Sequence, residues 1–379
     1  MGLTLACWAL PTQANAPVLS PIDVSLSESI ANLGLDEQLW GDNGSPDRAA
    51  LVTAIDHSLR YLNTQAAATA YDRYPVSGIT RDRVRRSLQR FRELLFTVDS
   101  PAALQAAVLQ EFDLYQSIGR DGLGTVDFTG YFQPTYTASR VPTAEFRYPL
   151  YRLPPGLEQW VQPHPTRREL EGADGLQGSQ GQLRGLELVW LRDRLEAFLV
   201  QVQGSARLQL TDGTVMTLGY AGRTDYPYTS IGRQLINDGK IAEADLTLPR
   251  VLQYFQTYPQ ELDQYLPRND RFIFFRETAD VAPSGSLGVP VTPERSIATD
   301  KSLMPPGALA LIVTQLPYLN PSGQAEARLV SRYVLDQDTG GAIRGAGRVD
   351  IFMGTGARAG DRAGLINAPG QLYYLLLKN

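Results

Sequence analysis

The glycine-rich stretch over residues 338–364 limits the folds open to this chain more than any other feature. Two carboxylates, Asp338 and Asp350, stand twelve positions apart among its glycines. Short apolar runs adjoin them at residues 351–352 and 372–377. Glycine lets a backbone turn sharply or approach a ligand closely, so the pattern predicts strand ends that present acids on tight turns.

Short strands are expected through most of the second half of the chain. Apolar runs recur between turns over residues 285–379, which favours a compact barrel. Strands are also predicted over residues 126–132 and 148–153 and within 269–276. Residues 195–210 are expected to form a strand, a bend at Gly204 and a second strand. Helices are expected over residues 230–238 and 248–258.

The section before residue 125 shows helical periodicity instead. Three helices are expected there, beginning at Ser45-Pro46-Asp47, near Thr80 and at Ser100-Pro101. At each point, capping residues or a proline precede apolar residues at helical spacing. Residues 17–44 are rich in Pro, Ser and Asp and are expected to be an extended lead-in.

The residue content narrows the chemistry that this chain can perform. Cys7 is the only cysteine, so no intrachain disulfide can form, and the two histidines, His57 and His164, are far apart in sequence. No metal site and no cofactor are therefore expected, and acid/base chemistry falls to Asp, Glu, Tyr or Lys. The net charge of -5, without a basic stripe, argues against a nucleic-acid partner.

The first sixteen residues resemble the end of a secretory signal. An apolar run precedes Thr12-Gln13-Ala14, which fits a cleavage site for export. Two alternatives stay open: Cys7 as a lipidation site, and a plain frayed terminus. No other run reaches the ~18 apolar residues of a membrane span.

Three aspartates are the candidates for catalysis. Asp300, Asp338 and Asp350 each lie between apolar β-type residues and a turn, so they are able to meet at one end of a barrel. Proximity and burial would raise one pKa and create a general acid. The alternative is that these aspartates cap turns. Asp338-Thr339-Gly340 also matches the aspartic-protease triplet, but that chemistry needs two such triplets and this chain has one.

Several motifs together resemble the membrane-bound lytic murein transglycosylase A family, with a carboxyl end that resembles its three-aspartate (3D) domain. The resemblance spans roughly residues 125–378 in preserved order. The motifs are Phe128-Thr129-Gly130-Tyr131-Phe132, Tyr148-Pro149-Leu150-Tyr151, Val202-Gln203-Gly204-Ser205, Tyr220-Ala221-Gly222, Ser230-Ile231-Gly232-Arg233, residues 338–345, residues 350–356 and Arg362-Ala363-Gly364.

The resemblance implies a mainly β (α+β) fold: a double-psi β-barrel with an inserted second β-rich domain, preceded by N-terminal helices. The barrel would comprise residues 125–134 and 279–379, and the insert residues 135–278. Residues 17–124 would form the lead-in and helices, and residues 1–16 the signal remnant. A glycan groove would lie between the two domains.

The resemblance also implies an activity, lytic cleavage of peptidoglycan glycan strands to 1,6-anhydro-N-acetylmuramic acid ends. Asp350 would act as acid and then base, and Asp338 would tune and position it. The implied substrate-binding residues are Gly130, Tyr131, Gln133 (where relatives often have Thr), Gln203, Ser205 and Asp300.

Further expectations are a monomer on the periplasmic side of the cell envelope, with outer-membrane association left open. A non-catalytic peptidoglycan-binding protein and a β-glycan hydrolase on the same barrel remain alternatives. The sequence does not distinguish endo- from exo-cleavage or define the preferred peptide stem.

Overall fold

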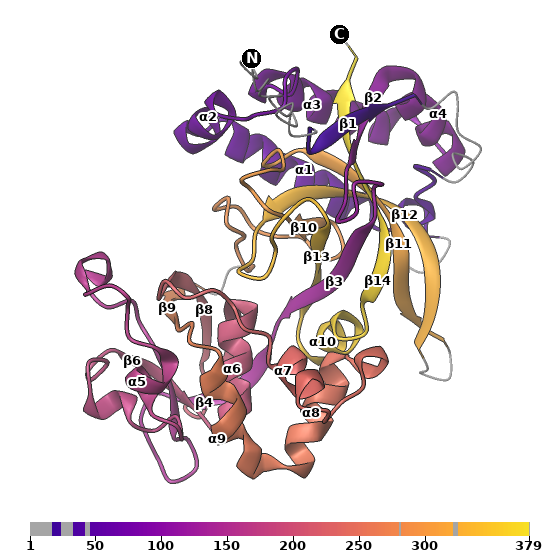
Figure 1. The fold of residues 1–379 in the computed structure, drawn as a ribbon. Coiled ribbons are helices and arrows are strands. Elements are labelled where there is room, and N and C mark those ends of the chain that lie inside the picture. The colour runs from indigo at the N-terminus through magenta and orange to yellow at the C-terminus, as the bar shows by residue number, and fades with distance from the viewer. Residues whose placement is uncertain (1–16, 24–32, 42–45, 280–281, 321–324, 379) are drawn as a thin grey trace, which may run out of the picture.

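The computed structural model describes residues 17–23, 33–41, 46–279, 282–320 and 325–378. Two β-sheets form separate parts of the molecule, and helices cover the first of them (Figure 1). Cys7 and the expected signal remnant over residues 1–16 lie outside the described ranges. Within those ranges, no helix combines the length and the apolar character needed to cross a membrane.

The first sheet closes into a six-stranded barrel. Its strands pair in the order β3, β13, β10, β12, β11 and β14, and β14 pairs again with β3. The pairs β3–β13 and β10–β12 are parallel, and the other pairs are antiparallel. The barrel strands are β3 (Val126–Gln133), β10 (Ser296–Ala298), β11 (Leu309–Leu319), β12 (Ala325–Asp338), β13 (Arg348–Thr355) and β14 (Asn367–Leu377).

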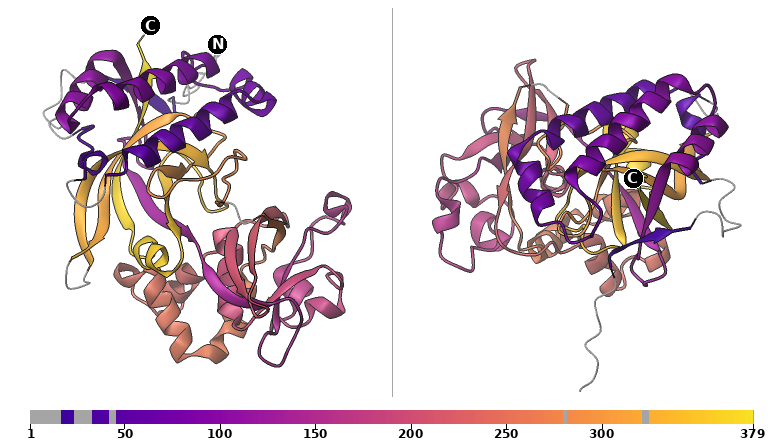
Figure 2. Two further views of the ribbon diagram at one scale, coloured as in Figure 1. Left: turned by 180° about the vertical axis from the view of Figure 1, so that it is seen from behind. Right: turned by 90° about the horizontal axis from the view of Figure 1, so that it is seen from above.

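Two short strands and four helices surround this barrel. Strands β1 (Leu19–Ile22) and β2 (Phe112–Ser117) extend the sheet from β14. Figure 2 shows the helices on the side of the barrel away from the second sheet. They are α1 (Arg48–Leu62), α2 (Gln65–Asp72), α3 (Arg81–Thr97) and α4 (Pro101–Glu111). Residues 372–376 of β14 are all buried, because one face of the strand points into the barrel and the other meets this helical layer.

The three predicted N-terminal helices are confirmed as α1, α3 and α4. Thr80 and Ser100 cap α3 and α4 by accepting hydrogen bonds from backbone N–H groups in the first turn of each helix, at Arg83 and Ala103. Helix α2 was not predicted. Thr64 caps it in the same way, by accepting from the backbone N–H of Ala67.

The second sheet is formed by the segment of chain between β3 and β10, which leaves the barrel after β3 and returns to it at β10. Its order is β5 (Tyr148–Tyr151), β6 (Glu187–Leu191), β4 (Thr135–Ser139), β7 (Ser205–Leu210), β8 (Val215–Arg223) and β9 (Ile273–Thr278). Its helices are α5 (Arg167–Glu171), α6 (Arg194–Gln203), α7 (Ile231–Asn237), α8 (Leu248–Thr257) and α9 (Leu262–Tyr265). The expected architecture, a β-barrel interrupted by a second β-rich domain and preceded by helices, is confirmed.

Two local predictions are wrong. Residues 195–203 form helix α6 rather than a strand, because Asp193 caps the helix through the backbone N–H of Glu196 and Gly204 ends it with a left-handed φ of 79°. Only the strand after Gly204 was predicted correctly, as β7. The strands after residue 285 are also longer than expected. Strands β11, β12 and β14 have 11, 14 and 11 residues, and helix α10 (Ala357–Ala363) precedes β14.

Candidate active site

Asp350 lies in the middle of the barrel wall, on β13 between β3 and β10. Its backbone neighbours across the sheet are Thr129 and Ala298. The Thr129 hydroxyl donates a hydrogen bond to Asp350 Oδ1 over 2.8 Å, and Arg348 in turn donates to the Thr129 oxygen over 3.1 Å. Oδ2 of Asp350 receives no hydrogen bond from any of the described residues.

Burial raises the pKa of Asp350 to about 6. The hydrogen bond from Thr129 and the charge of Arg348 oppose that rise, and the charge of Asp338 adds to it. At pH 7 about a tenth of this carboxyl is therefore protonated, far more than for an ordinary aspartate, and one of its oxygens is left without a protein donor. These are the two properties that a general acid needs.

Asp338 ends strand β12 and is held much more tightly. The Tyr131 hydroxyl donates to Oδ2 over 2.7 Å, and Oδ1 accepts from the backbone N–H groups of Ser286 and Thr339, both at 2.8 Å. Burial nevertheless raises the pKa of Asp338, against the lowering by these bonds and by Lys301. Its oxygens are occupied by donors, so it is fixed in place rather than open to a ligand.

The two acids are two strands apart on the same face of the sheet. Ala298 on β10 pairs with Asp338 on one side and with Asp350 on the other. Adjacent strands are about 4.8 Å apart, so the two Cα atoms are roughly 10 Å apart. Directly paired residues point to the same face, which explains how Asp338 raises the pKa of Asp350. The structure therefore brings together the first two predicted catalytic residues.

Asp300 stands apart from this pair and serves the loop that follows Asp338. It is 5% exposed. Oδ1 accepts from the backbone N–H and hydroxyl of Ser302, at 3.1 and 2.7 Å, and Oδ2 accepts from the backbone N–H of Gly345 at 2.9 Å. Burial alone would raise the pKa of Asp300, but these hydrogen bonds outweigh it and lower the pKa. Its oxygens are directed into the protein.

The remaining residues predicted to bind substrate gather where the chain passes from the barrel into the second domain. A Cβ on Gly130 would come within 2.8 Å of the Ala363 Cα, so Gly130 allows α10 to pack closely on β3. Gln133 is 3% exposed, and its Oε1 accepts from Thr355 over 3.1 Å.

Gln203 and Ser205 come from the second domain. Gln203 ends α6, and its Oε1 accepts from the backbone N–H of Phe132 on β3 at 3.0 Å, which fastens the second domain to the barrel. Ser205 begins β7 and is half-buried. Tyr131 is the one of this predicted set that touches an acid directly, through Asp338.

Sequence reasoning missed four residues around the acids, namely Thr129, Arg348, Tyr228 and Arg271. Burial raises the pKa of Tyr228, and the charge of Asp350 adds to the rise while those of Arg271 and Arg348 oppose it. The charge of the barrel acid thus acts on a tyrosine of the second domain. Arg348 had a usable signal, because it stands two positions before Asp350 and shares its face of the strand. Tyr228 and Arg271 had none.

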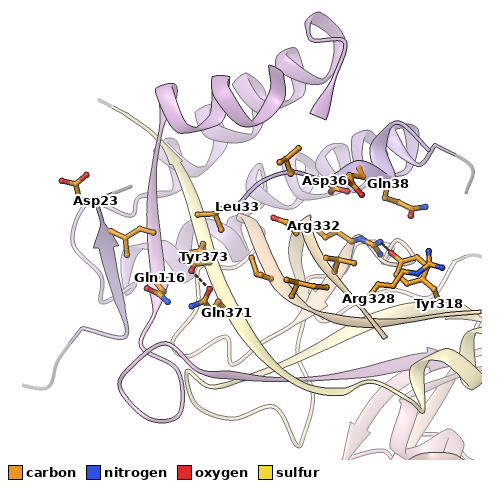
Figure 3. A pocket seen from close by; sticks show the side chains of 17 residues that line it. Asp23, Leu33, Asp36, Gln38, Gln116, Tyr318, Arg328, Arg332, Gln371 and Tyr373 are labelled. Atoms are coloured by element: carbon orange, nitrogen blue, oxygen red, sulfur yellow. Dashed lines mark hydrogen bonds between the residues drawn. The ribbon is translucent and has the colours of Figure 1, made fainter. Parts of the chain in front are cut away.

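A cavity of about 720 Å³ lies elsewhere, between residues 33–38 and strands β11 and β12 (Figure 3). Asp36, Tyr318 and Arg332 are among the side chains that line it, and neither Asp338 nor Asp350 is. The two predicted catalytic acids therefore do not line this cavity.

Known proteins resemble this chain in sequence and in fold. The sequence model described as "MltA specific insert domain" matches residues 127–276, and that described as "3D domain" matches residues 295–376. "Membrane-bound lytic murein transglycosylase A" of Escherichia coli (strain K12) is 32% identical over 265 residues, 69% of each chain. The protein of the same name from Vibrio cholerae serotype O1 is 32% identical over 295 residues, 77% of this chain and 75% of the relative.

A solved structure agrees with these sequence matches. The crystal structure of E. coli MltA with bound chitohexaose superposes with a TM-score of 0.69 at 25% identity. The match covers 88% of this chain and 90% of the other.

Proposed function

This chain belongs to the membrane-bound lytic murein transglycosylase A family, and on that premise we propose that it cleaves peptidoglycan glycan strands without water, using Asp350 as acid and then as base. The observation that carries the proposal is the state of Asp350. Its pKa is raised to about 6 and its Oδ2 accepts no hydrogen bond from the described residues. A protonated carboxyl with one open oxygen is suited to give its proton to a glycosidic oxygen.

In the first step, Asp350 protonates the oxygen between N-acetylmuramic acid and the following N-acetylglucosamine. The bond from that oxygen to C1 of the muramic acid breaks, and the bonding electrons leave with the oxygen. The N-acetylglucosamine departs with a free 4-hydroxyl, and positive charge develops on the muramic acid ring. Asp350 is now a carboxylate beside that cation and stabilises it.

In the second step, the 6-hydroxyl of the same muramic acid attacks C1. Asp350 accepts the proton from that hydroxyl and returns to its starting form. The product end is a 1,6-anhydro sugar, no water is consumed and the proton count balances. One carboxyl thus serves both steps, whereas a hydrolase that inverts configuration needs a second carboxylate to activate water.

Asp338 would act through Asp350 rather than on the sugar. Three hydrogen bonds hold Asp338 in place, and its charge contributes to the raised pKa of Asp350. We assign it the role of a positioning residue. Tyr131 links the two acids to β3, because its hydroxyl binds Asp338 and its ring packs on Phe352 of β13 at a centroid distance of 5.2 Å.

The glycan would lie between the barrel and the second domain. The charge of Asp350 raises the pKa of Tyr228 in the second domain, which supports a site to which both parts of the molecule contribute. The relative from E. coli binds chitohexaose, a neutral β-1,4 glycan, which supports a glycan of this linkage as the ligand class. In this proposal Tyr131, Gln203 and Ser205 border the glycan site, and the protein acts as a monomer.

Digestion of purified murein, followed by mass analysis of the released muropeptides, tests the proposal. Anhydro-muramic ends are expected. Reducing ends would make the protein a hydrolase, and an absence of products would make it a binding protein. The Asp350→Asn variant is expected to release anhydro ends roughly 10³-fold more slowly while still binding glycan. Cleavage by that variant at the wild-type rate would assign the acid to another residue.

The relatives' names place them at a membrane, and we propose that this protein works on the periplasmic side of the cell envelope, where its substrate lies. Fractionation of cells with an antibody against the described part of the chain checks this. Recovery with cytoplasmic markers would contradict it.

A further inference from the structure

Three arginines meet close to the two acids, and nothing in the cleavage chemistry uses them. Arg223 ends β8 and Arg271 lies just before β9, both in the second domain, while Arg344 lies in the barrel loop after β12. The carbonyl oxygen of Tyr226 accepts from both Arg223 Nη1, at 3.4 Å, and Arg271 Nε, at 2.8 Å. One acceptor therefore draws two guanidinium groups together.

Arg271 bridges the two parts of the molecule. A Cβ placed on Gly341 would lie only 1.5 Å from Arg271 Nη1, so the guanidinium rests directly on the Gly341 backbone. Gly341 is three residues after Asp338, on the same loop as Arg344. Any side chain at position 341 would displace Arg271. The position therefore requires glycine for this contact as well as for a turn.

Two of these arginines, Arg223 and Arg271, lack the counter-charges that buried arginines elsewhere in the fold possess. Among the residues that the structure describes, no carboxylate forms an ion pair with Arg223 or Arg271, and Arg271 is only 6% exposed. The side chain of Arg344 is 62% exposed and forms one long ion pair, with Asp300 Oδ1 at 3.9 Å.

Buried arginines outside this cluster are paired. Arg167 binds Glu171 at 3.2 Å, Arg295 binds Asp47 at 2.6 Å, and Arg332 binds Glu294. A buried cation without an anion is costly, so its retention indicates a partner that arrives from outside. The pKa of Arg271 shows the same excess of positive charge: burial, then Arg223 and Arg344, lower it to about 10.

The cluster adjoins the reactive centre. Arg271 rests on Gly341, three residues after Asp338, and the charges of both Arg271 and Asp350 shift the pKa of Tyr228. Tyr220 on β8 is 45% exposed, and Arg223 and Arg271 both lower its pKa against the rise caused by burial. An anion bound here would be attached to the sugar being cleaved or to its neighbour.

We propose that Arg223, Arg271 and Arg344 form a carboxylate-binding subsite that holds the negative charge carried by the muramic acid side of the substrate. The inference rests on the proposed function, because it takes peptidoglycan as the substrate. Guanidinium groups bind carboxylates through two parallel hydrogen bonds, so the geometry of the ligand matches that of the subsite.

Peptidoglycan offers two carboxylates of this kind. The lactyl group of muramic acid is a free carboxylate on a bare glycan strand, and the peptide stem carries carboxylates where the lactyl group is amidated. Chitin-type glycans have neither. The subsite would therefore let the enzyme prefer its own polymer over a neutral β-1,4 glycan that the same surface is able to accommodate.

Calorimetric binding in the Asp350→Asn background tests the subsite without cleavage. The ligands are chitohexaose, the alternating hexasaccharide with free lactyl groups, and the same hexasaccharide with peptide stems. The measured quantity is the ratio of affinity for each carboxylate-bearing ligand to that for chitohexaose. Arg344→Gln and Arg223→Gln are each expected to lower this ratio roughly tenfold, the worth of one charge-assisted hydrogen-bonded contact.

The pattern of loss identifies the source of the carboxylate. A loss confined to the bare hexasaccharide assigns the lactyl group, and a loss confined to the stem-bearing ligand assigns the peptide. Arg81→Gln, on the exposed start of α3, is the matched control and should leave the ratio at the wild-type value. An unchanged ratio in both Arg344→Gln and Arg223→Gln overturns the proposal.

Arg271→Lys and Gly341→Ala extend the test to the buried member of the cluster. Both are expected to lower the same ratio, and their thermal unfolding is measured to establish that they fold. The binding result is independent of the cleavage result. A lowered ratio with no anhydro products would keep the subsite and reject the lyase, whereas anhydro products with an unchanged ratio would do the reverse.

Discussion

Buried charged side chains form ion pairs on one side of the barrel and lack them on another. Beneath the residues 33–41 and α1, Arg295 is fully buried and bound to Asp36 and Asp47, at 2.5 and 2.6 Å. Facing the second domain, Asp350 and Asp338 have no ion-pair partner among the described residues, and Arg271 has none either.

Two acids of the barrel show this difference in their pKa values. Burial would raise the pKa of Glu294, but Arg362 and Arg332 lower it to about 2. Burial raises the pKa of Asp350 to about 6, because Thr129 and Arg348 compensate it only in part. Where anions and cations are paired they fix the fold; where they are kept apart they remain available to a substrate.

The largest expected effect comes from removing the unpaired acid. Asp350→Asn should lower the rate of release of anhydro-muropeptides from murein by roughly 10³-fold, because the amide has no proton of suitable acidity to give. Mass analysis of timed digests measures it. The Asp300→Asn variant is the comparison, since its carboxyl faces the loop. It should retain far more activity, and equal loss in the two variants would refute the distinction between them.

Removing the buried ion pairs of Arg295 should lower the stability of the fold rather than the rate of cleavage. Arg295→Met leaves Asp36 buried without its cation, and the free energy of unfolding should fall by about 3–5 kcal/mol. Urea denaturation followed by circular dichroism measures this, with Arg81→Gln as a surface control expected to stay within about 0.5 kcal/mol of wild type. A fall as small as that of the control would mean that the buried pair is not stabilising.

The unpaired acid Asp350 should lower the free energy of unfolding in a pH-dependent way. The folded pKa of Asp350, about 6, exceeds its unfolded value, so its contribution to stability is full below the unfolded pKa and is lost as the pH rises through 6. Asp350→Asn should therefore be more stable than wild type at pH 7.5, by about 1–3 kcal/mol. The difference should vanish near pH 4. Thermal melts at the two pH values decide it, and an equal difference at both would exclude titration as its cause.

The smallest effect is expected at Tyr131. Tyr131→Phe removes the hydroxyl that lowers the pKa of Asp338, so Asp338 should be less charged and should raise the pKa of Asp350 less. In wild type, kcat/KM should decline as the pH rises above about 6. In the variant, that decline should move to lower pH, with a loss of about fivefold in rate at pH 7. A decline at the wild-type pH would show that the two acids do not communicate.

The sequence was informative where structure depends on neighbours along the chain. Thr80 and Ser100 cap α3 and α4 within a single turn, and both helices were predicted at those residues. The wrong prediction of a strand over residues 195–203 has a local cause as well. Apolar residues there satisfy strand and helix spacing alike, and the capping by Asp193 decides the outcome.

The site was predictable only in part. Asp338 and Asp350 were identified through motifs, but what distinguishes them, three hydrogen-bond donors against one, depends on Tyr131, Ser286 and Thr129 from distant segments. Arg271 meets Gly341 across seventy positions of sequence, and no spacing or composition rule brings them together. Gly130 was predicted to bind substrate, whereas its contact with Ala363 gives it a packing role that needed three dimensions to see.

The closure of the barrel has a consequence for how the enzyme is made. Strand β3 lies between β13 and β14, which follow it by more than two hundred residues. Contacts this distant in sequence form slowly, because the intervening chain must be ordered first. During synthesis, β3 and the entire second domain emerge long before the strand that carries Asp350. The ribosome thus delivers the second domain first and Asp350 late, so a partly made chain lacks the carboxyl that the proposed cleavage requires.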